Sequence, residues 1–472
     1  MKHLFYLILT ALVTTLPIAA QDDLVTKIDE LVSQSYNMDL FSGTVTVAEN
    51  GKPIYQKAIG YADIENKVPN KMNTAFNFGS IGKMFTGAAI LKLAEEEKLN
   101  LDDNIDKYIN YFPEEIAKKI TIRHLLKHEA GLGDYLNNPK FRQNVNSYRS
   151  LNDLMNLIKD EQLLFEPGTS NRYSNSGYAT LGAVIESVTG KSFYVAIDNL
   201  ILEPLGLQHT YYSTVNQVRD KVVKYFRTME GTIMRTPFQD WPSPAGGEYS
   251  TTDDLLKFVQ GLFYSNKVLS DESKALFINR FDENRKSTWQ DILNDERFVP
   301  FWAGGAPGLN AAIVQYLKRN ITVTILTNFG PPFAINLGNQ IKSIIDTGNY
   351  LPIQIPLEEK IYKTYIENGV DYVETNFKQL IAGYRLMGTE DLIINQIGYT
   401  LISMGKIDDA IKLFTVNTKL FPEVANVFDS LAEAYMNNGN KEKAVENYKK
   451  VLELEPNSAT ASQSLKRLEE KQ

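Results

Sequence analysis

The sequence predicts a protein of the α/β (α+β) class, with an antiparallel sheet flanked by helices and an all-helical lobe, followed by an all-α repeat domain. Two observations carry this prediction. Strand signals open the first region at residues 41–63 and return at residues 309–327, on either side of a long helical stretch. Beyond residue 390, small, aromatic and proline residues recur with a period of 34.

The composition is that of an ordinary globular protein, with 43% hydrophobic and 22% charged residues in a chain of 472. At roughly 150 residues per domain, this length allows two or three domains. The 57 acidic and 49 basic residues give a net charge of -8, spread along the chain, which argues against a nucleic-acid partner. The absence of cysteine excludes disulfides, a thiol nucleophile and a lipidated cysteine.

Residues 1–20 have the layout of a secretory signal peptide. Lys2 precedes an apolar run that ends at Ala19 and Ala20, before a polar stretch. We therefore expect cleavage near Ala20 and export to the periplasm or the extracellular space. Ile18 is bulkier than the small residue usual at its position, so an uncleaved anchor is the alternative. After removal of the leader, we expect no membrane span.

Each element of the first domain, taken in chain order, has its own pattern. A helix is expected near residues 22–36, and Asn50-Gly51 between alternating strands predicts a hairpin with a tight primed turn. From Ser80 to about Leu99, apolar residues cover more than one helix face, which predicts a helix buried in the core. The closing elements are expected as strands at 309–316 and 321–327 and a helix at 333–345. We expect the opening and closing strands to share one antiparallel sheet.

The chain is predicted to consist of a domain at 21–347, a linker at 348–356, a helical part at 357–390 and repeats at 391–472. The residue pairs that repeat at 34 positions are Gly405 with Gly439, Ala410 with Ala444, Phe414 with Tyr448, Pro422 with Pro456, and Leu401 with Tyr435. They resemble tetratricopeptide helix-turn-helix repeats, in which small residues allow close helix contact. The part at 357–390 could be a diverged repeat, and 459–470 is expected to be a capping helix. Alternatively, these helices only dock on the first domain.

Ser80 and Lys83, three positions apart, carry the chemistry of the first domain. Positions i and i+3 share a helix face, so the Lys83 amine can reach the Ser80 hydroxyl at the helix N-terminus. An amine whose proton affinity is lowered by burial can take the serine proton, which activates a nucleophile without histidine. The same spacing occurs at Ser403 and Lys406, in the turn of a helical repeat, and we interpret that copy as chance.

A Tyr-x-Asn triplet at Tyr173 and Asn175 forms the second motif. The triplet is common by itself, but its surroundings are specific: it lies in FEPGTSNRYSNSGYATLGAVIESVTGKSF, with ITIRHLLKHEAGL upstream and ILEPLGL downstream. Together with the Ser-x-x-Lys pair and a Gly-rich strand at 302–308, in this order and separation, it resembles the serine β-lactamase-like (penicillin-binding-protein-like) family. The resemblance is to the branch of class C β-lactamases, D-Ala-D-Ala carboxypeptidases, D-amino-acid peptidases and family VIII carboxylesterases, over roughly residues 25–347.

By this resemblance, Ser80 would be the acylated nucleophile, Lys83 its base, and Tyr173 the proton shuttle to the leaving group and from the hydrolytic water. Asn175 would bind polar groups of the substrate. The residue chemistry agrees, since a phenol beside an ammonium is stabilised as a phenolate, so that Tyr173 could exchange protons near neutral pH. The alternative is structural, with Ser80 as a helix N-cap and Tyr173 as a packing residue.

The third motif of the family is altered in this chain. The family has Lys or His on the strand beside the site, followed two residues later by glycine, whereas this chain has Trp302, then Gly304, Gly305 and Gly308. By the resemblance, Trp302, Gly304 and Gly305 border the substrate, and the backbone N–H groups of Ser80 and Gly305 form the oxyanion pocket. Alternatively, the glycines only form a tight strand entry.

The missing cation bears on the substrate. In the family, that cation can pair with a substrate carboxylate, and some carboxylesterases of the family also carry Trp at this position. Its loss favours esters or neutral amides over penicillins. Phe301, Trp302 and Tyr249 could wall an apolar acyl pocket, and a place in the core fits each of them equally well.

Other reaction classes do not fit the residues. A phosphate-binding Walker loop fails because Asn77 and Met84 stand where Gly and Ser or Thr are needed. The chain has no Gly-x-Ser-x-Gly elbow, and its last histidine, His209, lies in mid-chain, against an α/β-hydrolase triad. His124 and His128 lie one helical turn apart, but no third ligand is evident, so we interpret them as structural. We expect neither a metal nor a cofactor.

These patterns predict an exported serine hydrolase that acts through a covalent acyl-enzyme on a small ester or a D-amino-acid peptide. A β-lactam substrate is less favoured. The repeats at 391–472 would serve protein or peptide contacts. The alternative is a non-catalytic ligand-binding or scaffolding protein of the same fold; the missing cation and the repeats favour it, and the intact Ser80, Lys83 and Tyr173 argue against it.

Overall fold

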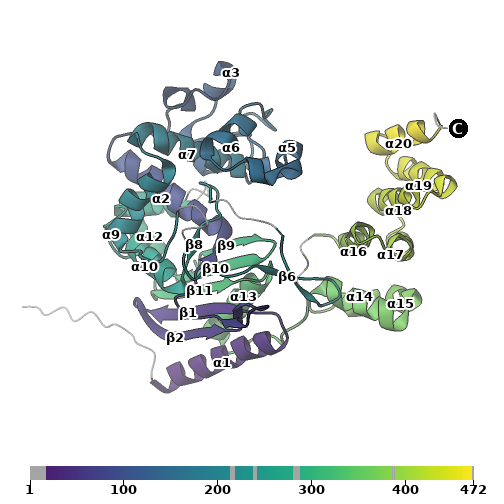
Figure 1. Ribbon diagram of the computed structural model, residues 1–472, viewed down its shortest axis with the longest axis horizontal. Coiled ribbons are helices and arrows are strands. Elements are labelled where there is room, and N and C mark those ends of the chain that lie inside the picture. Colours follow the sequence, from purple (N-terminus) through teal and green to yellow (C-terminus); the bar gives the residue numbers. More distant parts are fainter. Residues whose placement is uncertain are drawn as a thin grey trace, which may run out of the picture. The chain divides into compact units, whose positions relative to one another are not determined.

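The computed structural model describes residues 18–212, 218–237, 242–279, 287–384, 386 and 388–469, which belong to two compact units (Figure 1). The first unit comprises Met1–Phe226 and Arg235–Ile353, and the second comprises Arg227–Met234 and Gln354–Gln472. The boundary after Ile353 falls inside the predicted linker. The short segment Arg227–Met234, which lies inside the predicted first domain, is part of the second unit.

The first unit contains a five-stranded antiparallel sheet with the strand order β2-β1-β11-β10-β9. The strands are β1 (Gly43–Glu49), β2 (Lys52–Ile59), β9 (Phe301–Ala306), β10 (Leu309–Tyr316) and β11 (Ile321–Thr327). The opening strand β1 pairs with the closing strand β11, with Gly43 opposite Thr327, as predicted. Asn50 and Gly51 have positive φ angles of 51° and 72°, which confirms the primed turn of the first hairpin.

Helices cover this sheet and fill the region between its opening and closing strands. In chain order they are α1 (Ile18–Asn37), the 3₁₀ turn η1 (Gly79–Ile81), α2 (Gly82–Glu95), η2 (Ile105–Lys107), α3 (Glu114–Ala117), α4 (Ile122–Leu126), η3 (Tyr135–Asn137), α5 (Pro139–Gln143), η4 (Val145–Ser147), α6 (Leu151–Ile158), α7 (Asn175–Thr189), α8 (Phe193–Ile197), the π-helical turn η5 (Asp198–Leu202), α9 (Glu203–Leu205), α10 (Thr252–Phe263), α11 (Asp271–Asn279), α12 (Trp289–Asn294) and α13 (Phe333–Thr347). Short ladders join β3 (Tyr61–Asp63) to β4 (Val68–Pro69), β5 (Phe76–Asn77) to β8 (Tyr249–Ser250), and β6 (Tyr225–Arg227) to β7 (Ile233–Arg235). The predicted helical lobe is therefore confirmed.

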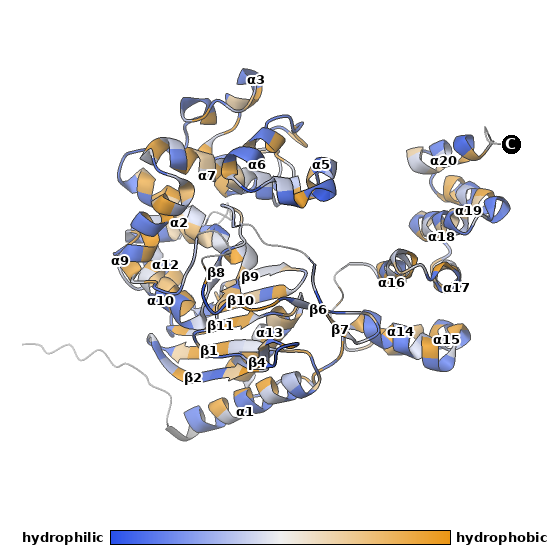
Figure 2. Cartoon of the chain, viewed as in Figure 1, coloured by the Kyte–Doolittle hydropathy of each residue, from blue (hydrophilic) through white to orange (hydrophobic). Residues whose placement is uncertain are grey.

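The two faces of the sheet are covered by different helices. On one face, α1 and α13 form an apolar core with the strands, in which Ile28, Val323 and Ile341 are fully buried. Figure 2 shows the apolar and polar residues alternating along α1, as expected for a helix with one buried side. On the other face, Thr324 donates a hydrogen bond to the Thr252 carbonyl at the start of α10, at 3.2 Å.

The predicted helix from Ser80 to Leu99 is shorter than expected. Ser80 lies in η1, and the α-helix begins two residues later at Gly82 and ends at Glu95. Glu97 has a positive φ of 54°, which is typical of a residue that follows a helix end. The burial of this helix on more than one face is confirmed.

Residues 1–17 of the predicted leader lie outside the described residues. The first helix begins at Ile18, before the predicted cleavage near Ala20. Within the part of the chain that the structure describes, no helix combines the length and the apolar character needed to cross a membrane. The prediction of export therefore rests on the sequence alone.

The second unit is helical and has apolar cores of its own. Its helices are α14 (Leu357–Asn368), α15 (Val370–Ile381), α16 (Asp391–Ser403), α17 (Ile407–Leu420), α18 (Ala425–Asn437), α19 (Lys441–Leu454) and α20 (Ala459–Glu469). Consecutive helices pack in pairs, and a Cβ atom on Gly398 would lie 2.4 Å from the Phe414 ring, so close contact of α16 and α17 requires glycine there. The helices thus pack on one another, which argues against the alternative that they only dock on the first domain.

A buried ion pair holds the segment Arg227–Met234 in the second unit. Arg227 donates from Nε to Glu359 Oε2 at 2.7 Å and from Nη2 to Glu359 Oε1 at 2.9 Å, and Glu359 is 1% exposed. Lys363 also donates to Glu359, at 2.7 Å. Met229 of the same segment packs against the apolar core of α14 to α18. These contacts account for the difference from the predicted domain boundary.

Candidate active site

A sharp turn presents Ser80 at the start of η1. Gly79 has a φ of 52°, a backbone conformation that favours glycine, and its N–H donates to Asn77 Oδ1 at 2.9 Å. The Asn77 amide in turn donates to the Gly247 carbonyl at 2.9 Å. The turn that carries Ser80 is therefore fixed by the Asn77 side chain, which belongs to the strand before it.

The structure brings the predicted catalytic residues together around the Ser80 hydroxyl. Lys83 Nζ lies 3.5 Å from Ser80 Oγ, and Tyr173 donates its hydroxyl proton to the same oxygen at 2.8 Å. Lys83 Nζ also donates to Asn175 Oδ1, at 2.7 Å, and to the Ala245 carbonyl. These two acceptors can take both N–H groups of a neutral amine, which leaves its lone pair for the Ser80 proton.

Burial prepares Lys83 to act as a base. The residue is 6% exposed, and its removal from water lowers its pKa to about 7, while the charges of Glu248 and Asp134 act to raise it. An amine with this pKa is partly unprotonated at neutral pH, whereas an exposed lysine is almost fully charged. The predicted role of Lys83 is therefore compatible with its surroundings.

Tyr173 differs from the expectation of a phenolate near neutral pH. Lys83 Nζ lies 4.8 Å from the centre of the Tyr173 ring, as the sequence analysis required. Removal of water from the hydroxyl nevertheless raises the pKa of Tyr173 to about 12; the hydrogen bond to Ser80 acts to lower it and the charge of Asp134 to raise it. Because the buried Lys83 amine is only partly charged at neutral pH, it gives a phenolate limited support, and the Tyr173 hydroxyl donates to Ser80.

Asn175 is engaged within the protein. Its side-chain oxygen accepts from Lys83, its nitrogen donates to Asp134 Oδ2 at 2.9 Å, and the residue is 6% exposed. In this state Asn175 orients Lys83, and its contact with a substrate stays a prediction. Asp134 was not predicted, because its only sequence signal is its position two residues after ITIRHLLKHEAGL, which ends at Leu132.

The Gly-rich strand β9 lies directly against the turn that carries Ser80. A Cβ atom on Gly304 would lie 2.1 Å from the Phe78 carbonyl oxygen and 2.8 Å from the Ser80 nitrogen, so only glycine fits this approach. A Cβ atom on Gly79 would lie 2.9 Å from the Gly305 nitrogen. The two amides predicted to stabilise an oxyanion thus come from two backbones in contact.

The aromatic residues near the third motif are found in apolar clusters. The Trp302 ring stacks on Phe263, with 5.6 Å between ring centroids. Phe301 packs into the core beneath α13, and Tyr249, 3% exposed, packs with Ala75 and neighbouring apolar residues. Of the two roles left open by the sequence, the core role is the one observed for Phe301 and Tyr249. At the position where the third motif has a cation, this chain has the apolar ring of Trp302.

The histidines near the site have structural roles. His124 accepts the Thr121 backbone N–H at 3.3 Å and completes a capping box at the start of α4. The His128 ring lies 4.8 Å from the Tyr173 ring and accepts the Ser174 N–H at 3.2 Å. Across the described ranges, no group of three or more His, Cys, Asp or Glu residues is placed to hold a metal ion.

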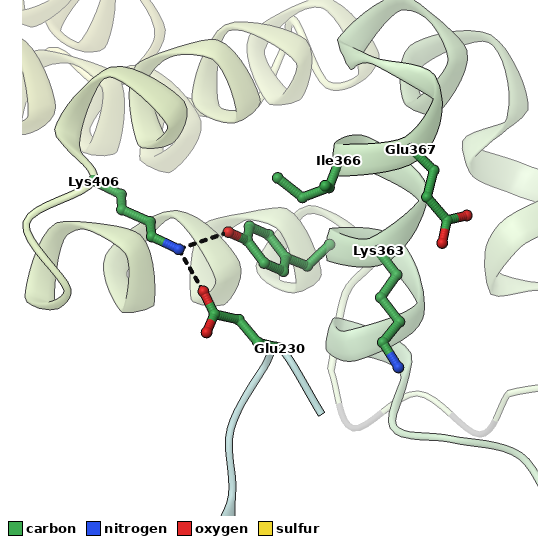
Figure 3. A pocket seen from close by; sticks show the side chains of 6 residues that line it. Glu230, Lys363, Ile366, Glu367 and Lys406 are labelled. Carbon is green, nitrogen blue, oxygen red and sulfur yellow. Dashed lines mark hydrogen bonds and ion pairs between the residues drawn. The ribbon is translucent and has the colours of Figure 1, made fainter. Parts of the chain in front are cut away.

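The second Ser-x-x-Lys pair makes unrelated contacts. Ser403 donates to the Thr400 carbonyl at 2.7 Å. Lys406 bonds to Glu230 and, at 3.0 Å, to the Tyr362 hydroxyl, as the dashed lines in Figure 3 show. The interpretation of this copy as chance agrees with these contacts.

Comparison with known proteins identifies the family. The family model described as Beta-lactamase matches residues 28–341, and the model described as Tetratricopeptide repeat matches residues 425–458. Penicillin-binding protein 4* of Bacillus subtilis (strain 168) is 30% identical over 315 residues, which are 61% of this chain and 68% of that protein. Protein flp of Staphylococcus aureus (strain N315) is 27% identical over 330 residues, which are 68% of this chain and 66% of that protein.

Solved structures show the same fold. EstCE1, a hydrolase with promiscuous acyltransferase activity, matches with a TM-score of 0.59 and 23% identity, over 69% of this chain and 99% of that chain.

The alignment with protein flp spans 66% of that protein's length, slightly less than two thirds. The Beta-lactamase model, in contrast, spans well over half of this chain. The chain therefore belongs to the Beta-lactamase family, that is, to the β-lactamase-like and penicillin-binding-protein-like serine hydrolases, and carries a tetratricopeptide repeat in its second unit.

Proposed function

We propose that the protein hydrolyses small esters or D-amino-acid peptides through a covalent acyl-enzyme on Ser80. The main support is the buried Lys83 amine, which lies 3.5 Å from the Ser80 oxygen with acceptors in place for its other N–H groups. Tyr173, 2.8 Å from the same oxygen, supplies the proton donor that a leaving group needs.

In the first half-reaction, the Ser80 proton moves to Lys83 Nζ while Ser80 Oγ forms a bond to the substrate carbonyl carbon. The carbonyl oxygen becomes negative and is stabilised by the N–H groups of Ser80 and Gly305. The bond to the leaving group then breaks, and Tyr173 gives its hydroxyl proton to the leaving oxygen or nitrogen. The proton held by Lys83 restores the Tyr173 hydroxyl.

In the second half-reaction, a water oxygen attacks the acyl carbon. Lys83, again neutral, receives one water proton through Tyr173. The bond between Ser80 Oγ and the acyl carbon breaks, and that proton returns to Ser80. One water is consumed, and a carboxylic acid is released.

The surroundings of Trp302 support esters or neutral amides as substrates. The Trp302 indole, which stacks on Phe263, carries no positive charge that could pair with a substrate carboxylate. Esters come first in this proposal, D-amino-acid peptides second and β-lactams third.

The proposal is tested by covalent capture of Ser80. Protein beginning at Gln21 is treated with a p-nitrophenyl phosphonate ester, digested, and examined by mass spectrometry. We expect one phosphonate adduct, on Ser80, with release of one p-nitrophenolate per chain, and no adduct on Ser403. Folded protein that stays unmodified would contradict the hydrolase proposal and support the alternative of ligand binding without turnover.

The pH dependence of hydrolysis follows from the state of Lys83. Lys83 accepts a proton only as a neutral amine, and burial lowers its pKa to about 7. We therefore expect kcat/KM for a short-chain ester to rise with pH through a midpoint near this value and to be lost below it, as the ammonium accumulates. Initial rates across the neutral range measure this profile, and a flat profile would contradict the base role.

We further propose export of the protein, on the basis of residues 1–20. N-terminal sequencing of secreted protein tests this, with Gln21 as the expected first residue and an intact Met1 as the contrary result. The tetratricopeptide repeat at 425–458 suggests protein contacts.

A further inference from the structure

Glu248 is a fully buried carboxyl whose side chain makes no hydrogen bond to another of the described residues. It follows Gly246 and Gly247, directly precedes β8, and has no exposed surface. Neither Oε1 nor Oε2 finds a hydrogen-bond partner among the residues that the structure describes. Burying a polar group in this way is unfavourable, so its presence calls for a physical reason.

Backbone contacts place this carboxyl behind the nucleophile and against the first turn of α2. The Phe78 N–H donates to the Glu248 carbonyl at 3.0 Å. A Cβ atom on Gly82 would lie 2.3 Å from Glu248 Oε2, so the carboxyl fills the space left by the glycine directly before Lys83. Three residues before Glu248, the Ala245 carbonyl accepts from Lys83 Nζ. The segment from Ala245 to Glu248 therefore holds both a hydrogen-bond acceptor of Lys83 and a buried acid that lies against Gly82.

The acid and the amine change each other's proton affinity. Burial raises the pKa of Glu248, while its own backbone N–H and the Lys83 charge act to lower it. Burial lowers the pKa of Lys83 to about 7, and the Glu248 charge acts to raise it. The two groups therefore titrate as a coupled pair, in which an ionised Glu248 favours the charged form of Lys83.

The other titratable or charged groups around this pair are Asp134, Tyr135, Tyr173, Tyr178, Tyr194, Tyr212 and His128. The charge of Asp134 acts on Lys83 in the same direction as that of Glu248. Burial raises the pKa of Tyr135, Tyr194 and Tyr212, and the charge of Glu248 adds to the effect on each. These three phenols therefore stay protonated in the neutral range and do not compete with Glu248 for its proton.

We propose that Glu248 is a positioning residue that makes Lys83 a stronger base, because Glu248 in its ionised form stabilises the ammonium formed when Lys83 takes the Ser80 proton. The inference rests on the proposed acyl-enzyme route. In that step one proton leaves Ser80 Oγ and binds Lys83 Nζ, and Glu248 forms no bond to substrate. When the proton passes on through Tyr173, Lys83 returns to the neutral amine.

The test compares wild-type protein beginning at Gln21 with its Glu248→Gln variant. NMR of ¹³C-labelled lysine side chains follows the protonation of Lys83, with its signal assigned from a Lys83→Met variant. We expect the Lys83 midpoint to fall by about one pH unit, since an opposite charge nearby shifts a pKa by roughly 1–3 units. The midpoint of kcat/KM for a p-nitrophenyl ester falls in parallel, with a plateau lower by a few-fold, because a weaker base removes the Ser80 proton more slowly.

A matched control and a second variant make the result decisive. Glu161→Gln removes another carboxyl whose pKa is raised by burial and which bonds to Ser176, and it leaves the Lys83 midpoint unchanged. If thermal unfolding shows the Gln variant to be unfolded, Glu248→Met, of similar length and apolar, replaces it with the same expected shift. An unchanged Lys83 midpoint in either folded variant overturns the inference. A shifted midpoint in a protein without Ser80-dependent hydrolysis supports the action of Glu248 on Lys83 and contradicts the proposed function instead.

Discussion

Ester hydrolysis is expected to fall by about 10³-fold or more in the Ser80→Ala variant, because no acyl-enzyme forms without the Ser80 oxygen. Lys83 and Tyr173 remain in this variant, but there is no Ser80 oxygen to attack the ester. The measurement is kcat for a short-chain p-nitrophenyl ester with protein beginning at Gln21. Thermal unfolding of the same samples checks that the variant is folded.

The chain supplies a matched control for this substitution. Ser403 is the serine of the second Ser-x-x-Lys pair, and its hydroxyl bonds to the Thr400 carbonyl. Ser403→Ala is therefore expected to keep the wild-type rate. Equal rates in wild type and Ser80→Ala would show that Ser80 is not the nucleophile for simple esters, and weight would move to a strict peptidase or to ligand binding without turnover.

The sheet was the most predictable part of the fold. Strands β10 and β11 occupy residues 309–316 and 321–327, the predicted ranges. Their signals are local, because apolar runs and a polar turn define both ends of each strand. Asn50-Gly51 was equally local, since both residues tolerate the positive φ angles that the turn requires.

The start of the helix after Ser80 was not predictable from local pattern. The apolar residues continue through Ser80-Ile81, yet the α-helix begins at Gly82. Next to η1 lies a tertiary contact, the close approach of Gly304 in β9 to Phe78 and Ser80, which the local pattern does not contain. The segment Arg227–Met234 was missed for a similar reason, because Arg227 pairs with Glu359, 132 residues away.

The motifs predicted which residues meet at the site but not how they are bonded. Lys83 bonds to Asn175, 92 residues away, and to Ala245, 162 residues away. Neither bond has a sequence signal, so Asn175 was expected to serve the substrate and not the lysine. The raised pKa of Tyr173 and the buried acid at Glu248 depend on the surrounding burial, which a motif does not contain.

Replacing Lys83 with arginine is expected to lower kcat by roughly 10²- to 10⁴-fold, the usual contribution of a general base. Arginine keeps the positive charge and can still donate to Asn175 and Ala245, but its guanidinium does not lose a proton in proteins. Lys83→Arg therefore distinguishes a role of Lys83 as a base from a role as a positive charge that only stabilises the site. The loss is measured as kcat for the same ester, and the rise in rate near pH 7 disappears with it.

Lys406→Arg is the matched control for this substitution. Lys406 belongs to the second Ser-x-x-Lys pair, bonds to Glu230 and Tyr362, and is expected to tolerate the change with an unaltered rate. Because arginine is bulkier at a site that is 6% exposed, Lys83→Met provides a second variant if thermal unfolding shows that Lys83→Arg does not fold. A folded Lys83→Arg or Lys83→Met protein with wild-type kcat would exclude Lys83 as the base. Tyr173, 2.8 Å from Ser80 Oγ, would then be the remaining acceptor, with a pKa of about 12 that would move the pH midpoint far above neutral.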